Sequence, residues 1–162
     1  MSLFRFDKNN YVFNPSSKLG VYILHGFTST TYEVKNLAEF LGNNGYCTVA
    51  NNLPGHGTSV QECNDTTYLE WISFTENKFA ELSSSCDQVF ICGISMGALL
   101  AMNISMLFPV NGLISVAPVL EFNKPFKIYF LNPLLCHIMK SRPKKHEVNR
   151  GQNIYYGYNK WP

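Results

Sequence analysis

Short apolar runs alternate with polar, glycine-containing stretches along the first 120 residues of the chain. Five of these runs have the length and the β-branched or aromatic content of strands. They are Tyr11–Phe13, Val21–Leu24, Thr48–Asn52, Val89–Cys92 and Gly112–Val116. Between them, helical spacing of apolar residues covers about residues 31–41, 68–82 and 96–108. Strands that alternate with helices predict right-handed crossovers and an α/β fold with a mostly parallel sheet.

End signals support these helix boundaries. Thr30 with Glu33, and Thr67 with Glu70, have the spacing of capping boxes, in which each side chain bonds the backbone N–H of the other residue. Pro109 ends the third helix because proline lacks the N–H that a helix interior needs. We therefore expect the first two helices to begin directly after Thr30 and Thr67.

Residues 88–120 contain no charged side chain, which raises the question of a membrane span. Polar residues, glycines and a proline interrupt this stretch: Gly93, Ser95, Gly97, Asn103, Ser105, Pro109 and Asn111. A buried strand, a buried helix and a second buried strand explain the pattern better, because central strands of parallel sheets are covered on both faces. We expect no integral membrane segment.

Composition and charge divide the chain near residue 120. With 162 residues, 46% of them hydrophobic and 15% charged, the chain is expected to fold as one apolar-rich domain. Residues 1–120 carry five Lys/Arg and nine Asp/Glu, whereas residues 121–162 carry eight Lys/Arg and two Glu. The basic residues of 121–162 are interpreted as a solvated surface rather than an anion-binding site, and no nucleic-acid partner is predicted.

The cysteines favour a reducing environment. Their number is odd, and no pair has the spacing of a metal-binding or redox motif: Cys47, Cys63, Cys86, Cys92 and Cys136. Neither a disulfide scaffold nor a zinc site is expected, and no other metal or cofactor is predicted. The N-terminus shows no signal-peptide pattern, so a cytoplasmic location is expected.

A Gly-x-Ser-x-Gly motif, from Gly93 through Ser95 to Gly97, joins the fourth predicted strand to the third helix. A serine at such a sharp turn is held in a strained conformation with its hydroxyl exposed. Glycines flank it where side chains would collide. The first N–H groups of the helix, beginning with Met96, could stabilise an oxyanion. An ordinary tight turn remains the alternative for this motif alone.

Two further motifs follow predicted strands. His25-Gly26-Phe27 ends the second strand, and a Leu-Pro-Gly-His-Gly segment containing His56 follows the third. Each histidine, taken alone, is most simply a structural residue that hydrogen-bonds its own loop. The carboxyl ends of parallel strands meet at one edge of the sheet, which is where ligands bind in open α/β sheets. We therefore expect the three motifs to converge on one site.

The order of these motifs, from about Tyr11 to Pro118, resembles the α/β-hydrolase superfamily. It is most similar to small carboxylesterases and monoacylglycerol-lipase-type serine hydrolases. The resemblance implies an α/β-hydrolase-like sheet with flanking helices and Ser95 as the nucleophile of an acyl-enzyme mechanism. It also implies an oxyanion hole formed by the backbone N–H groups of Phe27 and Met96. The substrate implied is a small apolar ester, because the surrounding segments supply no cation for a charged acyl group.

The resemblance also assigns the remaining segments. It implies structural roles for His25, Gly26 and His56, since the catalytic base of these enzymes comes late in the chain. Residues 1–120 would form the N-terminal part of the hydrolase core, and residues 121–162 the start of a cap or lid region. The fold is then expected to stop before its last strands.

A catalytic acid and base are missing from the expected positions. After Ser95 the chain has no aspartate, and none of its remaining acids and histidines follows a predicted strand: Glu121, Glu147, His137 and His146. Three hypotheses remain. The chain is a serine esterase without its acid- and base-bearing half, a catalytically inactive binding or interaction protein, or a short enzyme that uses His137 or His146 with Glu121 or Glu147. In the first, a C-terminal half or self-association would cover the free edge of the strand Gly112–Val116.

Overall fold

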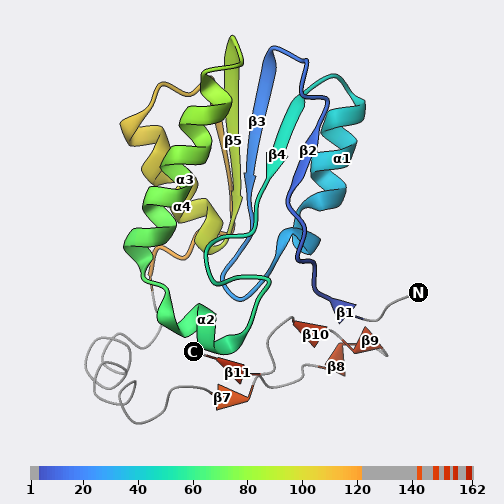
Figure 1. Cartoon of the computed structure of the whole chain (residues 1–162), viewed down its shortest axis with the longest axis vertical. Coiled ribbons are helices and arrows are strands. Elements are labelled where there is room, and N and C mark those ends of the chain that lie inside the picture. The colour runs from blue at the N-terminus through green and yellow to red at the C-terminus, as the bar shows by residue number, and fades with distance from the viewer. Residues whose placement is uncertain are drawn as a thin grey trace.

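A computed structural model describes residues 4–121 and five two-residue strands between residues 142 and 161, with side chains described for residues 6–121. Its main sheet has five strands in the order β2-β4-β3-β5-β6 (Figure 1). These strands are β2 (Tyr11–Phe13), β3 (Leu19–Leu24), β4 (Cys47–Ala50), β5 (Gln88–Ile94) and β6 (Gly112–Val116). Only β2 runs antiparallel to its neighbour, so the predicted α/β fold with a mostly parallel sheet is confirmed.

The helices lie between the strands along the chain. They are the 3-10 helix η1 (Thr31–Glu33), α1 (Lys35–Asn43), α2 (Val60–Asp65), α3 (Tyr68–Ser83) and α4 (Met96–Leu107). The short strands pair outside the main sheet: β1 (Phe4–Arg5) with β10 (Tyr155–Tyr156), β7 (Arg142–Pro143) with β11 (Lys160–Trp161), and β8 (Val148–Asn149) with β9 (Gln152–Asn153). The short helix α2 has no counterpart in the sequence-based expectation.

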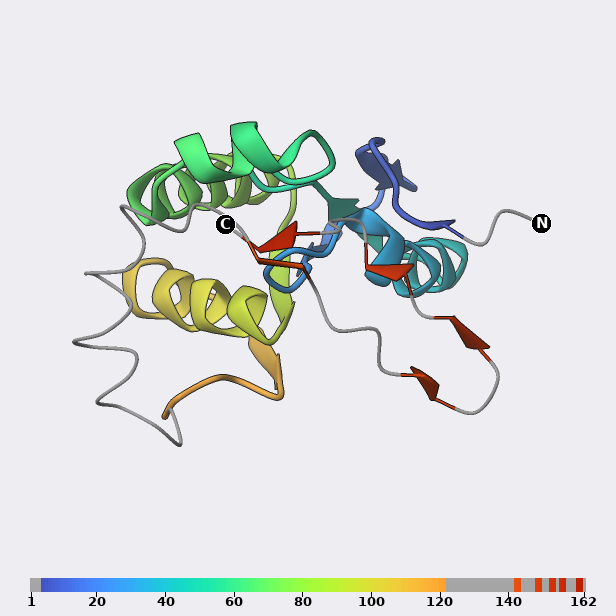
Figure 2. The ribbon, with the colours of Figure 1, turned by 90° about the horizontal axis from the view of Figure 1, so that it is seen from below.

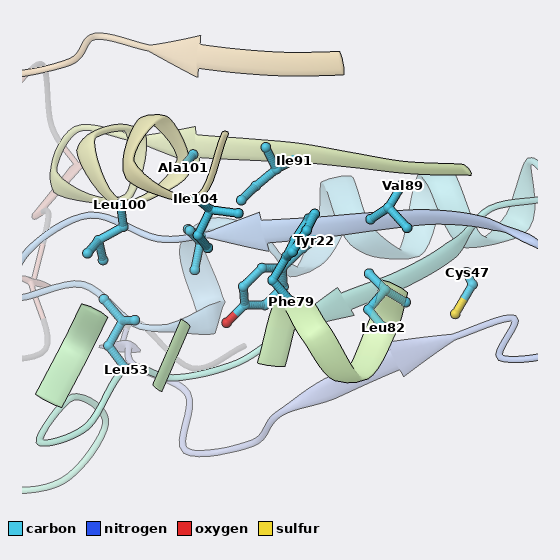
Figure 3. Close-up of a cluster of buried hydrophobic side chains, with 11 residues drawn as sticks. Tyr22, Cys47, Leu53, Phe79, Leu82, Val89, Ile91, Leu100, Ala101 and Ile104 are labelled. Atoms are coloured by element: carbon cyan, nitrogen blue, oxygen red, sulfur yellow. The ribbon is translucent and has the colours of Figure 1, made fainter. Parts of the chain in front are cut away.

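Two apolar clusters cover opposite faces of the sheet, with α3 and α4 on one side and α1 on the other (Figures 1 and 2). Alternate residues of β3 supply both, because successive side chains of a strand point to opposite faces. Tyr22 and Leu24 belong to the α3–α4 cluster shown in Figure 3, and Val21 and Ile23 belong to the α1 cluster. The central strand β3 is therefore buried on both faces, as its apolar sequence predicts.

Of the two predicted capping boxes, one is present in the structure and the other is not. The capping box of Thr67 and Glu70 is formed at the start of α3. The expected box of Thr30 and Glu33 is wrong. Thr30 caps the short 3-10 helix through the N–H of Tyr32, while the Glu33 carboxylate accepts the backbone N–H of Gly26 at 2.8 Å. The Glu33 carboxylate that a capping box would require is thus bonded to the backbone N–H of Gly26 instead.

The charge-free pattern of residues 88–120 predicts a buried strand at Gly112–Val116, but the strand is exposed and has the free edge expected if its neighbouring strand is missing. Among the described strands, β6 pairs only with β5, and four of its five residues are exposed. Ile114 is 57% exposed and Val116 46% exposed. No described element covers the outer edge of β6 or its own exposed apolar side chains.

The proposed cap region, residues 121–162, lies outside the described residues apart from Glu121 and the short strands β7 to β11. His137, His146 and Glu147 also lie outside them. In the part of the chain that the structure describes, no helix has both the length and the apolar character to cross a bilayer.

Candidate active site

Ser95 occupies the turn between β5 and α4 in a backbone conformation that L-residues rarely adopt. Its φ is 54° and its ψ is −114°, and it directly precedes the first residue of α4, Met96. Conformations of this kind cost on the order of 1–3 kcal/mol and cluster at functional sites. The Ser95 N–H donates to the carbonyl oxygen of Val116 at 2.9 Å, which ties this turn to the end of β6.

The two glycines around Ser95 have no room for a side chain. A Cβ at Gly93 would collide with the backbone of Gly97. A Cβ at Gly97 would lie 2.5 Å from the carbonyl oxygens of Leu24 and His25, closer than real Cβ contacts. The helix after Ser95 therefore passes directly over the end of β3 only because both positions are glycine.

The loop after β3 packs against the Ser95 turn. A Cβ built on Gly26 would lie 3.3 Å from the Cβ of Ser95. The Gly26 carbonyl oxygen is 2.8 Å from His25 Nδ1 and accepts the N–H of Ser29 at 3.2 Å. Because the N–H of Phe27 belongs to the same peptide unit as this carbonyl, these contacts fix the direction of the Phe27 N–H beside Ser95.

His25 is fully engaged in holding loops. Its Nδ1 donates to the Gly26 carbonyl, and its Nε2 accepts the N–H of Leu53 at 3.1 Å, which assigns the proton to Nδ1. Burial, and then the nearby His56, lower the pKa of His25 to about 3. His25 is therefore a neutral histidine that links the loops after β3 and β4.

His56 belongs to an aromatic cluster with Phe27 and Trp71 beside the same loops. The ring of His56 lies 5.9 Å from that of Phe27 and 5.4 Å from that of Trp71, centroid to centroid. Its Nδ1 and the Trp71 Nε1 both contact the carbonyl oxygen of Pro54, at 3.1 and 2.9 Å. Burial lowers the pKa of His56. Sequence reasoning did not single out Trp71, although an indole N–H on a half-buried helix face generally needs an acceptor.

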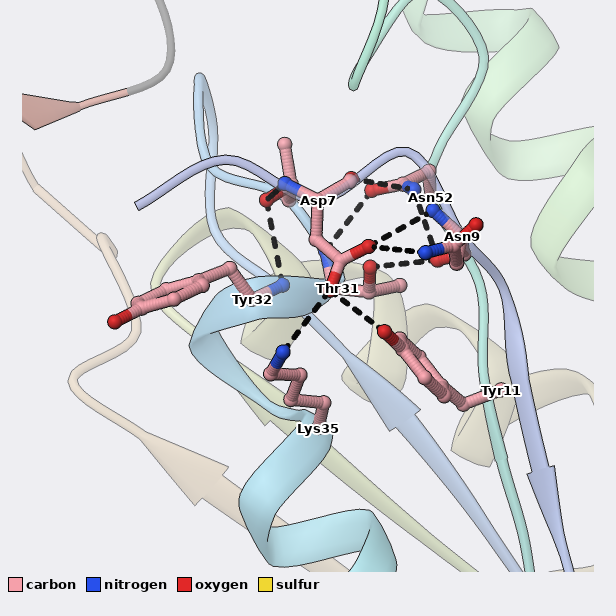
Figure 4. A network of polar contacts seen from close by, with 8 residues as sticks. Asp7, Asn9, Tyr11, Thr31, Tyr32, Lys35 and Asn52 are labelled. Carbon is pink, nitrogen blue, oxygen red and sulfur yellow. Dashed lines mark hydrogen bonds and ion pairs between the residues drawn. The ribbon is translucent and has the colours of Figure 1, made fainter. Parts of the chain in front are cut away.

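A polar network fixes the N-terminal segment to the loops after β3 and β4 and to the start of α1 (Figure 4). The Asp7 carboxylate accepts hydrogen bonds from the Tyr11 hydroxyl at 2.7 Å and from Lys35 Nζ at 3.2 Å. The Asp7 N–H donates to Thr30 Oγ1, and Asn52 Nδ2 donates to the Asp7 carbonyl. Burial raises the pKa of this carboxyl, yet the hydrogen bonds that it accepts, from Tyr11 first, hold that pKa below its usual value.

The three motifs thus meet at the carboxyl ends of β3, β4 and β5. The histidines of the first two are occupied by backbone partners, and Glu121 is exposed. Within residues 6–121, no group of three or more His, Cys, Asp and Glu side chains is arranged to hold a metal ion. The arrangement offers a strained serine beside two adjacent backbone segments, the end of β3 and the start of α4.

Two solved structures with similar folds are those of lipolytic enzymes. A structure of the metagenome-derived lipolytic enzymes LipS and LipT matches with a TM-score of 0.78 and 24% identity, covering 96% of this chain and 63% of that chain. A soluble variant of monoglyceride lipase from Saccharomyces cerevisiae, in complex with a substrate analogue, matches with a TM-score of 0.61 and 20% identity, over 75% and 44% of the two chains. At these identities the likeness establishes the fold alone.

Curated relatives match in sequence. A thermostable monoacylglycerol lipase from Bacillus sp. (strain H-257) is 30% identical over 108 residues, covering 62% of this chain and 43% of the relative. A carboxylesterase from Bacillus subtilis (strain 168) is 26% identical over 110 residues, covering 67% and 45%. The chain therefore spans less than half the length of these two relatives. Residues 15–156 match the family described as serine aminopeptidase, S33. The chain belongs to this family of α/β hydrolases, whose relatives here are esterase- and lipase-like.

Proposed function

We propose that this chain supplies the nucleophile and the oxyanion hole of a carboxylic ester hydrolase. The observation that carries the proposal is the strained Ser95 turn packed against Gly26. Ser95 Oγ attacks the ester carbonyl and forms an acyl-enzyme, which water then hydrolyses. The N–H groups of Phe27 and Met96 stabilise the oxyanion, and loss of one such donor typically costs about 10²–10³ in rate.

The substrate proposed is a small ester with an uncharged, apolar acyl group. The half-buried rings of Phe27 and Trp71 lie next to the Ser95 loop and favour apolar groups. The Glu33 carboxylate, bonded to Gly26, would repel an anionic acyl group at this place. The names of the Bacillus relatives, a monoacylglycerol lipase and a carboxylesterase, agree with this class.

The base and the acid are proposed to come from a further C-terminal segment. His25 and His56 hold the backbone, so neither serves Ser95 as a base. Without a triad histidine, the catalytic rate falls by on the order of 10⁶. The remaining rate is about 10³–10⁴ times that of the uncatalysed reaction in water. We therefore expect the 162-residue chain alone to hydrolyse p-nitrophenyl esters very slowly.

A substrate series tests this proposal. The protein completed by an acid- and histidine-bearing segment should hydrolyse p-nitrophenyl butyrate and fail on the matched ester with a succinyl acyl group. Ser95→Ala should abolish both the activity and the burst of p-nitrophenol. Equal rates on the two esters would refute the proposed acyl selectivity, and activity that persists in Ser95→Ala would refute the nucleophile.

The alternative function is a catalytically inactive binding or interaction protein on the same scaffold. The engagement of both described histidines favours it. A short enzyme that uses Glu121 or Glu147 with His137 or His146 would instead make the 162-residue chain active. Substituting His137 and His146 in an active chain would test that third possibility.

A further inference from the structure

Two cysteines lie close to one glycine of the sheet, one over it and one beside it. Gly20 of β3 is paired in register with Cys47 of β4. A Cβ built on Gly20 would lie 3.0 Å from Cys86 Sγ and 3.3 Å from Cys86 Cβ. Paired residues in neighbouring strands direct their side chains to the same face, about 4.8 Å apart. Cys86 therefore fills the space that a side chain at position 20 would occupy, directly beside Cys47.

The two thiols are neighbours in one cluster. Cys86 packs against the α3–α4 cluster that contains Cys47, and its thiol donates to the carbonyl oxygen of Ser17 at 3.7 Å. The two thiols lie close enough for Cys86 to contribute to the raised pKa of Cys47. Cys92 belongs to the cluster on the opposite face of the sheet, and Cys63 lies on α2. Cys47, Cys63, Cys86 and Cys92 are all free thiols.

A cleft with a volume of about 190 Å³ lies beside the pair. Its lining includes Cys47, Leu82 and Ser85, the residue before Cys86, but not Cys86 itself. Figure 3 shows Cys47 beside Leu82 at the end of the cluster far from Leu53. Cys86 is half-buried, whereas Cys47 is 4% exposed. Cys86 is therefore the more accessible sulfur.

We propose that Cys47 and Cys86 form an oxidation site that closes to an intramolecular disulfide when it reacts with a small hydroperoxide. The Cys86 thiolate attacks the terminal peroxide oxygen, the O–O bond breaks, and an alcohol or water leaves. The resulting Cys86 sulfenic acid is attacked by Cys47, which forms the S–S bond and releases water. The two thiols lose two protons and two electrons in total, and the peroxide is reduced.

The surroundings of the two thiols favour Cys86 as the first nucleophile and Cys47 as the second. Burial raises the pKa of the Cys47 thiol, with a smaller contribution from Cys86, so Cys47 is a poor first nucleophile. As the second nucleophile it is already held against its target, where proximity raises the effective concentration by several orders of magnitude. The disulfide would close the segment from β4 to the end of α3, which carries His56 and Trp71. It would link the start of β4 to the chain before β5, at the edge of the sheet opposite the Ser95 site, and is independent of the proposed ester hydrolysis.

Peptide mapping of the 162-residue chain tests the proposal. After mild treatment with hydrogen peroxide, the Cys47–Cys86 peptide pair should be the main cross-link, and the intact mass should fall by two hydrogen atoms. Cys86→Ser and Cys47→Ser should each abolish it, whereas the controls Cys63→Ser and Cys92→Ser should keep it. The oxidised chain should also unfold several °C higher than the reduced chain, as a closed loop stabilises the fold.

Two results would overturn the proposal. One is a cross-link that mainly joins Cys136 or Cys63 to another thiol. The other is over-oxidation of Cys86 to its sulfinic or sulfonic acid while Cys47 stays reduced. A second variant keeps the test decisive if Cys47→Ser or Cys86→Ser fails to fold. Gly20→Ala keeps both cysteines but places a methyl group 3.0 Å from the sulfur of Cys86, and it should slow cross-linking.

Discussion

The carboxylate of Glu33 accepts the backbone N–H of Gly26 at 2.8 Å, at a point where a Cβ on Gly26 would lie only 3.3 Å from the Cβ of Ser95. This bond anchors the peptide unit that joins His25 to Gly26. His25 Nδ1 anchors the carbonyl of the next peptide unit, which joins Gly26 to Phe27 and carries the proposed oxyanion donor, the Phe27 N–H. A side chain outside the three motifs thus helps to set the shape of the site.

Replacing Glu33 should loosen this loop. Hydrogen bonds to charged groups contribute about 1.5–3 kcal/mol, so Glu33→Ala should speed amide exchange at Gly26 by about 10–100-fold. Glu33→Gln keeps an acceptor and should restore most of the protection. The exchange can be followed by NMR or mass spectrometry, with the exposed Glu39→Ala as a control. Unchanged protection in Glu33→Ala would contradict the role given to this carboxylate.

His25 should remain neutral far below the usual histidine range. Its pKa in the folded chain is about 3, against about 6.5 when unfolded. The unfolded state therefore binds a proton first as the pH falls, and stability should decline from about pH 6.5 down to about pH 3. His25→Gln should flatten this slope in denaturant titrations. NMR titration of the His25 ring with a midpoint near pH 6.5 would disprove the buried, neutral assignment.

Asp7 should stabilise the chain through its hydrogen bonds. Asp7→Asn is expected to cost about 1.5–3 kcal/mol in the free energy of unfolding. Most of this should come from Tyr11, because Lys35 is 34% exposed and its ion pair is screened. Chemical denaturation measures the loss, and Asp87→Asn on the exposed surface serves as the matched control. Equal stabilities of the two variants would contradict the account.

The pH dependence gives a second test of Asp7. Its folded pKa lies below the unfolded value of about 3.9. The stabilisation is therefore fully present above the unfolded pKa and is lost as the pH falls through the folded pKa. Asp7→Asn should unfold with a shallower dependence on pH below about pH 4 than the wild-type chain.

The outer edge of β6 should drive self-association. Unpaired backbone groups and the exposed side chains of Leu113 and Ile114 offer a template for another strand. Ile114→Lys should lower both the dimer fraction in sedimentation and the binding of hydrophobic dyes. Phe40→Lys replaces an equally exposed residue on α1 and should leave both unchanged. A wild-type chain that is monomeric and binds no dye would refute this prediction.

The order of the elements was predictable because each strand is a compact apolar run. Tyr11–Phe13 and Gly112–Val116 match β2 and β6 residue for residue. The apolar run alone did not predict the exposure of β6, since an apolar strand has the same sequence whether or not a neighbour covers it. The free edge was expected only from the missing strands that the resemblance implies. The helix α2 escaped prediction because its six residues are too few to show a period.

The residues of the candidate site that belong to a sequence motif were predictable. Those whose role depends on contacts with residues far away in the sequence were not. Three motifs located Ser95, Gly26 and His25. The contact of Glu33 with Gly26 was hidden, since a carboxylate three residues after a threonine has the sequence of a capping box. Trp71 and the Cys47–Cys86 contact depend on how α3 lies on the sheet, which no local pattern records.

Labelling with a fluorophosphonate probe tests the central claim most directly. The probe forms a covalent bond with an activated serine, so we expect labelling of the protein completed by its acid and histidine segment, at Ser95 alone. Ser95→Ala should remove the label, whereas Ser105→Ala within α4 should not. Labelling at another serine, or labelling that persists in Ser95→Ala, would contradict the account.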